Sequence, residues 1–134
     1  MPSFLSPLLR DPSGSFRLVN ARTNGIIADH LLAAFDSKSR KTGLLAHHSL
    51  AAGTAMIIAP TNAIHTFFMK FAIDVLFVAK DGLIVKTRES MAPWRVSAAW
   101  RAFGVVEVAA GTLARLDVKC GDRLTCVQDK QSVV

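Results

Sequence analysis

The sequence contains only two cysteines, Cys120 and Cys126, which lie six residues apart. On one extended strand, at about 3.3 Å per residue, their Cα atoms would stand roughly 20 Å apart. A disulfide requires a Cα separation of about 7 Å or less, so we expect two free thiols. Two thiols without a neighbouring histidine or a third cysteine are also too few for a structural zinc site. The sequence therefore predicts neither a disulfide nor a structural metal.

Long apolar runs are also missing. No stretch approaches the roughly 20 apolar residues that cross a bilayer, because the most apolar segment, 71–79, is short and contains Asp74. The first ten residues carry no basic leader followed by an apolar core, and Pro2 and Pro7 interrupt them. We expect a cytoplasmic protein without a membrane span.

The common catalytic and cofactor-binding motifs are absent. The sequence has no Gly-x-Ser-x-Gly elbow, no Gly-rich phosphate loop ending in Lys-Ser/Thr, and no Gly-x-Gly-x-x-Gly. It also shows no internal repeat with a period of about 20 to 50 residues. These absences give no support to the usual hydrolase and nucleotide-binding machinery, and no cofactor is predicted.

The chain has the size and composition of one globular domain. It has 134 residues, of which 51% are hydrophobic and 19% are charged, and such a chain can bury a sufficient core. Residues 1–14 contain three of the five prolines and predict an irregular leader. We expect a single β-rich domain over residues 15–130.

Short apolar runs separated by turn-forming residues indicate a mainly β fold. We expect a compact β-sandwich or a partly closed β-barrel with one or two short helices. The clearest hairpin joins 73–78 to 83–87 through Asp81-Gly82, and a second turn at Asn24-Gly25 joins 17–21 to 26–29. Residues 36–50 predict a short helix capped by Asp36 or Ser37. Residues 96–102 fit either a second short helix or an irregular loop.

Asp74 is the most unusual residue of the sequence, because it interrupts a strand that is apolar on both faces. A buried carboxylate needs a partner, since burying it alone costs several kcal/mol. One interpretation is that Asp74 ties a loop to the strand. The other is that it points into a ligand site.

Glu107 repeats this pattern in the apolar run 105–109, and two interpretations are again open. An outward-facing glutamate on an edge strand is the simpler one. Alternatively, Asp74 and Glu107 form an acid/base site with His65, if their strands are neighbours. The same three residues could hold a metal ion only if the fold brought them together, and no metal site is predicted.

Aromatic and charged residues gather around Asp74 in the sequence, and this mixture is typical of a small-molecule pocket. In this hypothesis apolar walls that include Phe67 surround Asp74 and Arg40 as polar anchors. The candidate site is formed by Arg40, His65, Phe68, Met69, Asp74, Trp94 and Glu107. The leading functional hypothesis is a module that binds an unidentified small molecule, and a small acid/base enzyme is the alternative.

The net charge of +6 suggests a third and least favoured hypothesis, nucleic-acid binding. The residues considered for it are Lys38, Arg40, Lys41, Arg95 and Arg101. The basic excess is spread along the chain, and the cluster at 38–41 is shorter than the blocks that usually mark nucleic-acid patches.

Several of these segments resemble one known family. The run IHTFFMKFAIDVLFVAKDG (64–82) is similar to the central signature of domain-of-unknown-function family 192, also called uncharacterised protein family 0127. Arg40-Lys41-Thr42-Gly43-Leu44-Leu45 resembles its Arg-x-x-Gly-Leu-Met block, and PWR (93–95), VEVAAG (106–111) and GD (121–122) follow in the family's order. The likeness covers about residues 17 to 127. It implies a compact, mainly β fold with short helices, and it supplies no activity or catalytic residue.

Overall fold

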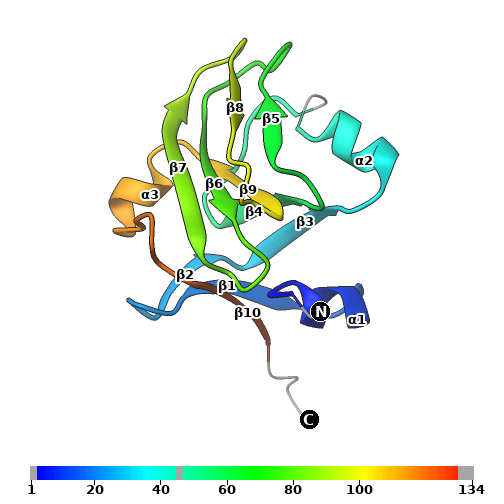
Figure 1. The fold of residues 1–134 in the computed structure, drawn as a ribbon, viewed down its shortest axis with the longest axis vertical. Coiled ribbons are helices and arrows are strands. Elements are labelled where there is room, and N and C mark those ends of the chain that lie inside the picture. The colour runs from blue at the N-terminus through cyan, green and yellow to red at the C-terminus, as the bar shows by residue number, and fades with distance from the viewer. Residues whose placement is uncertain (1–2, 45–46, 130–134) are drawn as a thin grey trace.

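The computed structural model describes residues 3–44 and 47–129. Over this part of the chain, ten strands and three short helices form the fold shown in Figure 1. The helices are α1 (Ser6–Arg10), α2 (Ser37–Thr42) and α3 (Thr112–Arg115). Leu45, the last residue of the block that begins at Arg40, lies outside the described residues.

The strands form three sheets that lie in layers (Figure 1). A three-stranded antiparallel sheet has the order β10 (Leu124–Gln128), β1 (Phe16–Asn20), β2 (Gly25–Ala28). The central five-stranded sheet has the order β3 (His30–Ala34), β4 (Thr54–Ile58), β9 (Gly104–Ala109), β6 (Ile73–Val78), β7 (Ile84–Met91). Only the β3–β4 pair in it is parallel. A two-stranded ribbon pairs β5 (Ala63–His65) with β8 (Val96–Ala98).

The central sheet is covered on both faces, and each face contributes to its own core. On β6, Leu76 and Val78 pack in the core shared with the three-stranded sheet, whereas Val75 and Phe77 pack in the core on the side of the ribbon and α2. This alternation follows from the period of two along a strand. The prediction of a mainly β fold is confirmed, and no sheet in the described residues closes into a barrel.

The predicted central hairpin is confirmed as β6 and β7. Gly82 in its turn has φ +92°, and a Cβ atom there would lie 2.2 Å from the carbonyl oxygen of Leu124, so glycine is required for this close approach. The Asn24-Gly25 turn is also present, but Asn24 takes the left-handed conformation, with φ +58°, while Gly25 begins β2. Asparagine tolerates that conformation better than most residues.

Two segments contain regular structure that the sequence does not predict. Residues 6–10 of the expected leader form α1, and Leu5 and Leu8 are buried in the core, because apolar side chains in the leader can cover the edge of that core. Residues 96–98 form a strand rather than a helix or a loop, since β5 supplies the pairing partner.

The cap of α2 and the state of the two cysteines agree with what the sequence predicts. The Asp36 side chain caps α2 as expected, by accepting a hydrogen bond from the Ser39 N–H at 2.7 Å. Cys120 and Cys126 are both free thiols, and burial raises the pKa of the Cys126 thiol to about 11. Among the described residues, no helix has the length and apolarity that crossing a membrane requires.

Candidate functional site

A pocket of about 300 Å³ lies between α2, β5 and the five-stranded sheet. Its apolar wall comes from four residues of the core on that side: Leu44, Ile58, Ile64 and Met69. Its polar wall includes Arg40, Lys41, Thr61, His65 and Glu107. The pocket therefore combines an apolar body with cationic and carboxyl groups.

Helix α2 positions Arg40 at the wall of the pocket. The helix is fixed at its start by the Asp36 cap and ends at Gly43, which has φ +47°. The Arg40 guanidinium donates to the Phe35 carbonyl oxygen at 2.8 Å and to the Ser37 hydroxyl at 3.3 Å. Because a guanidinium has five N–H donors, some of them remain for a ligand. Neither Arg40 nor Lys41 forms an ion pair within the described residues.

Glu107 lies in the pocket wall on β9, the middle strand of the five-stranded sheet. It pairs with Met56 on one side and Val75 on the other, and the residue is only 4% exposed. Its Oε2 atom is buried and has no hydrogen-bond partner among the residues that the structure describes. Burial raises the pKa of Glu107 to about 7. The interpretation as an outward-facing glutamate on an edge strand is therefore wrong.

His65 connects the pocket to the surface. It lies at the end of β5, is exposed, and lines the pocket. Its ring stacks on Phe67 at a centroid distance of 4.9 Å, and its Nδ1 atom accepts the Phe67 N–H at 3.3 Å. Of the seven residues predicted to form a site, the structure thus brings together Arg40, His65, Met69 and Glu107.

Asp74 lies on the opposite face of the central sheet. It pairs with Val108, whereas Glu107 pairs with Val75, and residues directly opposite each other share a face. The two carboxylates therefore point in opposite directions. The expected acid/base arrangement with His65 is not formed. Among the residues that the structure describes, no three of His, Cys, Asp and Glu are grouped to hold a metal ion.

The Asp74 side chain is fully buried and ties two segments to β6. One carboxylate oxygen accepts the Ser90 N–H at 2.8 Å, and the other accepts the Leu113 N–H at 3.0 Å. Ser90 belongs to a β-bulge, because the pairing of β6 with β7 shifts between Ile73 and Val75. Asp74 therefore fixes this bulge and the start of α3, which is the first of its two predicted roles.

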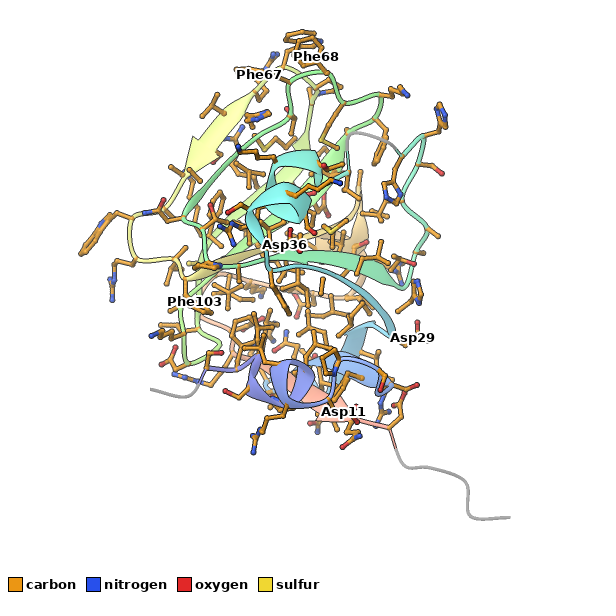
Figure 2. All side chains as sticks on the ribbon, turned by 90° about the vertical axis from the view of Figure 1, so that its right-hand side faces the viewer. Asp11, Asp29, Asp36, Phe67, Phe68 and Phe103 are labelled. Carbon is orange, nitrogen blue, oxygen red and sulfur yellow. The ribbon has the colours of Figure 1, made fainter. Side chains whose placement is uncertain are left out.

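The remaining predicted residues, Phe68 and Trp94, lie outside the pocket. Together with Phe67 they form an exposed cluster, here called the aromatic apex, and Figure 2 shows Phe67 and Phe68 at one end of the molecule. Phe67, Phe68 and Trp94 are 36%, 70% and 55% exposed. The Trp94 ring lies 4.6 Å from that of Phe68 and 5.8 Å from that of Phe67.

The buried residue Thr66 holds the two loops of the aromatic apex together. Its hydroxyl donates to the Ala92 carbonyl oxygen at 2.7 Å and accepts the Arg95 N–H at 2.9 Å. Its own carbonyl oxygen accepts the Trp94 N–H at 2.9 Å. Phe68 and Trp94 have φ values of +66° and +65°, which cost about 1 to 2 kcal/mol each for residues with a Cβ atom. The Thr66 contacts offset this strain.

Replacing Thr66 by valine should lower the free energy of unfolding by about 2 kcal/mol. The change keeps the shape of the side chain but leaves the Arg95 N–H and the Ala92 carbonyl without this partner. Urea unfolding monitored by circular dichroism measures the effect. The matched control is Thr125→Val, an exposed position on β10, and equal stability of the two variants would contradict the assignment.

Lys41 and Thr61 line the pocket, and Thr66 joins the loops of the aromatic apex, but none of them is among the predicted site residues. The sequence signal for Lys41 is that it follows Arg40 in the same predicted helix, which could have indicated that both cations line one pocket. Thr61 and Thr66 carry no comparable signal, because their sequence neighbours do not reveal that distant segments meet there. The pairing of β5 with β8 brings these segments together.

Comparison with known proteins agrees with this architecture. A structure described as a "putative transcription regulator" from Sinorhizobium meliloti 1021 is 26% identical, with a TM-score of 0.73, and the match covers 84% of this chain and 92% of that one. A protein of unknown function from Novosphingobium aromaticivorans DSM 12444 is 19% identical, with a TM-score of 0.69 and 82% of each chain covered. No curated protein matches the chain. The model of the family DUF192, described as "Uncharacterized ACR", matches residues 20–126, so the chain belongs to this family.

Proposed function

We propose that the protein binds a small organic anion in the pocket between α2, β5 and the central sheet. The observation that carries this proposal is the Oε2 atom of Glu107, which is buried in the pocket wall without a hydrogen-bond partner in residues 3–44 and 47–129. Buried polar atoms are nearly always paired in folded proteins. A ligand with a hydrogen-bonding group at this position would complete the pairing.

The chemistry of the wall defines the class of ligand. Arg40 and Lys41 would bind an acidic group, since arginine matches carboxylate and phosphate oxygens particularly well. The apolar wall would cover a short hydrocarbon body, and Glu107 would bind a hydroxyl, amine or amide group. A pocket of about 300 Å³ lies at the lower end of the range for ligand sites. The ligand is therefore a small molecule with an acidic group and a second polar group.

The test is a binding screen of the full chain against hydroxy acids, amino acids and sugar phosphates, read by native mass spectrometry and followed by calorimetry. Arg40→Met should weaken the binding of a hit by about tenfold or more, because it removes a charged hydrogen bond. Arg10→Met is the matched control, since it removes the same charge from the exposed end of α1. Failure of every compound to bind, or equal binding by both variants, would contradict the proposal.

Acid/base catalysis in the same pocket is a second candidate function. It is favoured by the Glu107 carboxyl group, whose pKa of about 7 allows it to give and take a proton near neutral pH. In this form His65 and Glu107 carry the chemistry, and Asp74 has no part in it. Turnover of a bound compound that is lost in Glu107→Gln while binding remains would favour this candidate over simple binding.

A further inference from the structure

We propose that the aromatic apex is a docking surface for an anionic lipid bilayer. The apex consists of Phe67, Phe68 and Trp94; the rings of both phenylalanines lie beside that of Trp94, and all three side chains are exposed. The vertical direction in both figures is the longest axis of the molecule; Figure 2 shows Phe67 and Phe68 at its upper end, and Figure 1 shows α1 in the lower part. The apex is therefore a projecting end of the protein.

The backbone holds this end in a fixed shape. Phe68 and Trp94 both occupy the left-handed region, and the Thr66 hydrogen bonds join their loops. Placing two large aromatic residues in strained conformations and then exposing them does not help the fold. A surface that is already ordered loses little conformational entropy when it binds, so the arrangement fits a contact surface.

The charges beside the apex complement an anionic surface. Lys70 and Arg95 are exposed next to the aromatic residues in the sequence and form no ion pair within the described residues. The cations that do form ion pairs are Arg17, Arg22, Lys119 and Arg123. They belong to β1 and to the segments that flank the three-stranded sheet, at the other end of the molecule. Basic residues beside exposed tryptophan and phenylalanine are typical of surfaces that bind the bilayer interface.

The size and shape of the apex favour a bilayer over the other partners. At the observed exposures, its three side chains present roughly 350 Å², well below the roughly 800 Å² per partner of a standard protein interface. Single-stranded nucleic acid needs open ring faces along a basic groove. Here the rings of Phe68 and Phe67 are tilted against that of Trp94 by 59° and 34°, so the three rings do not form a row of parallel stacking faces.

Vesicle flotation tests the proposal on the full chain. The probes are vesicles of phosphatidylcholine alone and of equal parts phosphatidylcholine and phosphatidylglycerol. We expect binding to the anionic vesicles only, and the double variant Phe68→Asn, Trp94→Asn should lose about tenfold or more in affinity. Asparagine is chosen because it tolerates the left-handed conformation, and thermal unfolding checks that this variant is folded. Trp100→Asn is the matched control, because Trp100 is 84% exposed but follows the end of β8, whereas Trp94 precedes its start.

Fluorescence separates insertion from simple charge attraction. The chain has two tryptophans, so Trp100→Phe leaves Trp94 as the single reporter. Insertion predicts a blue shift of its emission and quenching by brominated lipid in the anionic vesicles. Absence of vesicle binding would overturn the proposal, as would binding that the double variant retains or that leaves Trp94 emission unchanged. Binding of a single-stranded oligonucleotide that depends on Phe68 and Trp94, without vesicle binding, would also overturn it.

Discussion

Replacing Asp74 by alanine should lower the free energy of unfolding by about 3 kcal/mol or more, the largest effect that we expect from one substitution. The carboxylate is fully buried and accepts the N–H groups of Ser90 and Leu113. Hydrogen bonds to a charged group contribute about 1.5 to 3 kcal/mol each, and the alanine variant leaves both donors without this acceptor. Urea unfolding of the purified protein measures the loss.

Two variants make this result specific. Asp74→Asn keeps the size of the side chain but retains only one acceptor oxygen, so its stability should lie between those of the wild type and Asp74→Ala. Glu89→Ala removes an exposed carboxylate from the neighbouring strand β7 and should change stability by less than about 0.5 kcal/mol. A stable Asp74→Ala variant would mean that the two N–H groups find other partners and that Asp74 does not hold the bulge and α3.

Local features of the fold could be predicted because their causes lie within a few residues. The hairpin at Asp81-Gly82 depends on the conformation that glycine permits, and the start of α2 depends on the side chain of Asp36. The burial of Asp74 could also be predicted, since its neighbours on both faces of the strand are apolar. Each of these inferences needs only the sequence around one position.

The arrangement of the site could be predicted only in part, because it depends on pairing between distant strands. The register of β6 with β9 places Asp74 and Glu107 on opposite faces of the sheet, and a shift of one residue would have placed them together. The position of β9 in the middle of the sheet buries Glu107. Phe68 and Trp94 are exposed and have positive φ values, neither of which their sequence neighbours indicate.

The buried carboxylates of Asp74 and Glu107 differ in whether the protein satisfies them. Asp74 accepts two backbone N–H groups, so its charge contributes to holding β6, β7 and α3 together. Glu107 has a buried oxygen without a hydrogen-bond partner in the described part of the chain, and burial raises the pKa of its carboxyl group. A buried carboxylate that lowers the stability of the folded protein is hard to explain by folding alone. This contrast is why we assign a structural role to Asp74 and a ligand-binding role to Glu107.

Glu107 should make the protein more stable at mildly acidic pH than at alkaline pH. Its pKa in the folded protein is about 7, above the ordinary value of 4.5, so its contribution is complete below about pH 4.5 and is lost as the pH rises through about 7. The difference between these values corresponds to roughly 3 kcal/mol. Glutamine does not titrate. The free energy of unfolding of Glu107→Gln minus that of the wild type should therefore increase by up to roughly 3 kcal/mol between about pH 5 and about pH 8.5.

The measurement is the free energy of unfolding of both proteins in urea at several pH values between about 5 and 8.5. Titration of all other groups is common to the two proteins and cancels in the difference. The carboxyl group of Asp122, whose pKa is lowered to about 2 mainly by its hydrogen bond from Arg22, loses its stabilising contribution only at lower pH. A difference between wild type and Glu107→Gln that does not change with pH would mean that the Glu107 carboxyl group is solvated in the folded protein. In that case the pocket would lack the unsatisfied group on which its assignment as a ligand site depends.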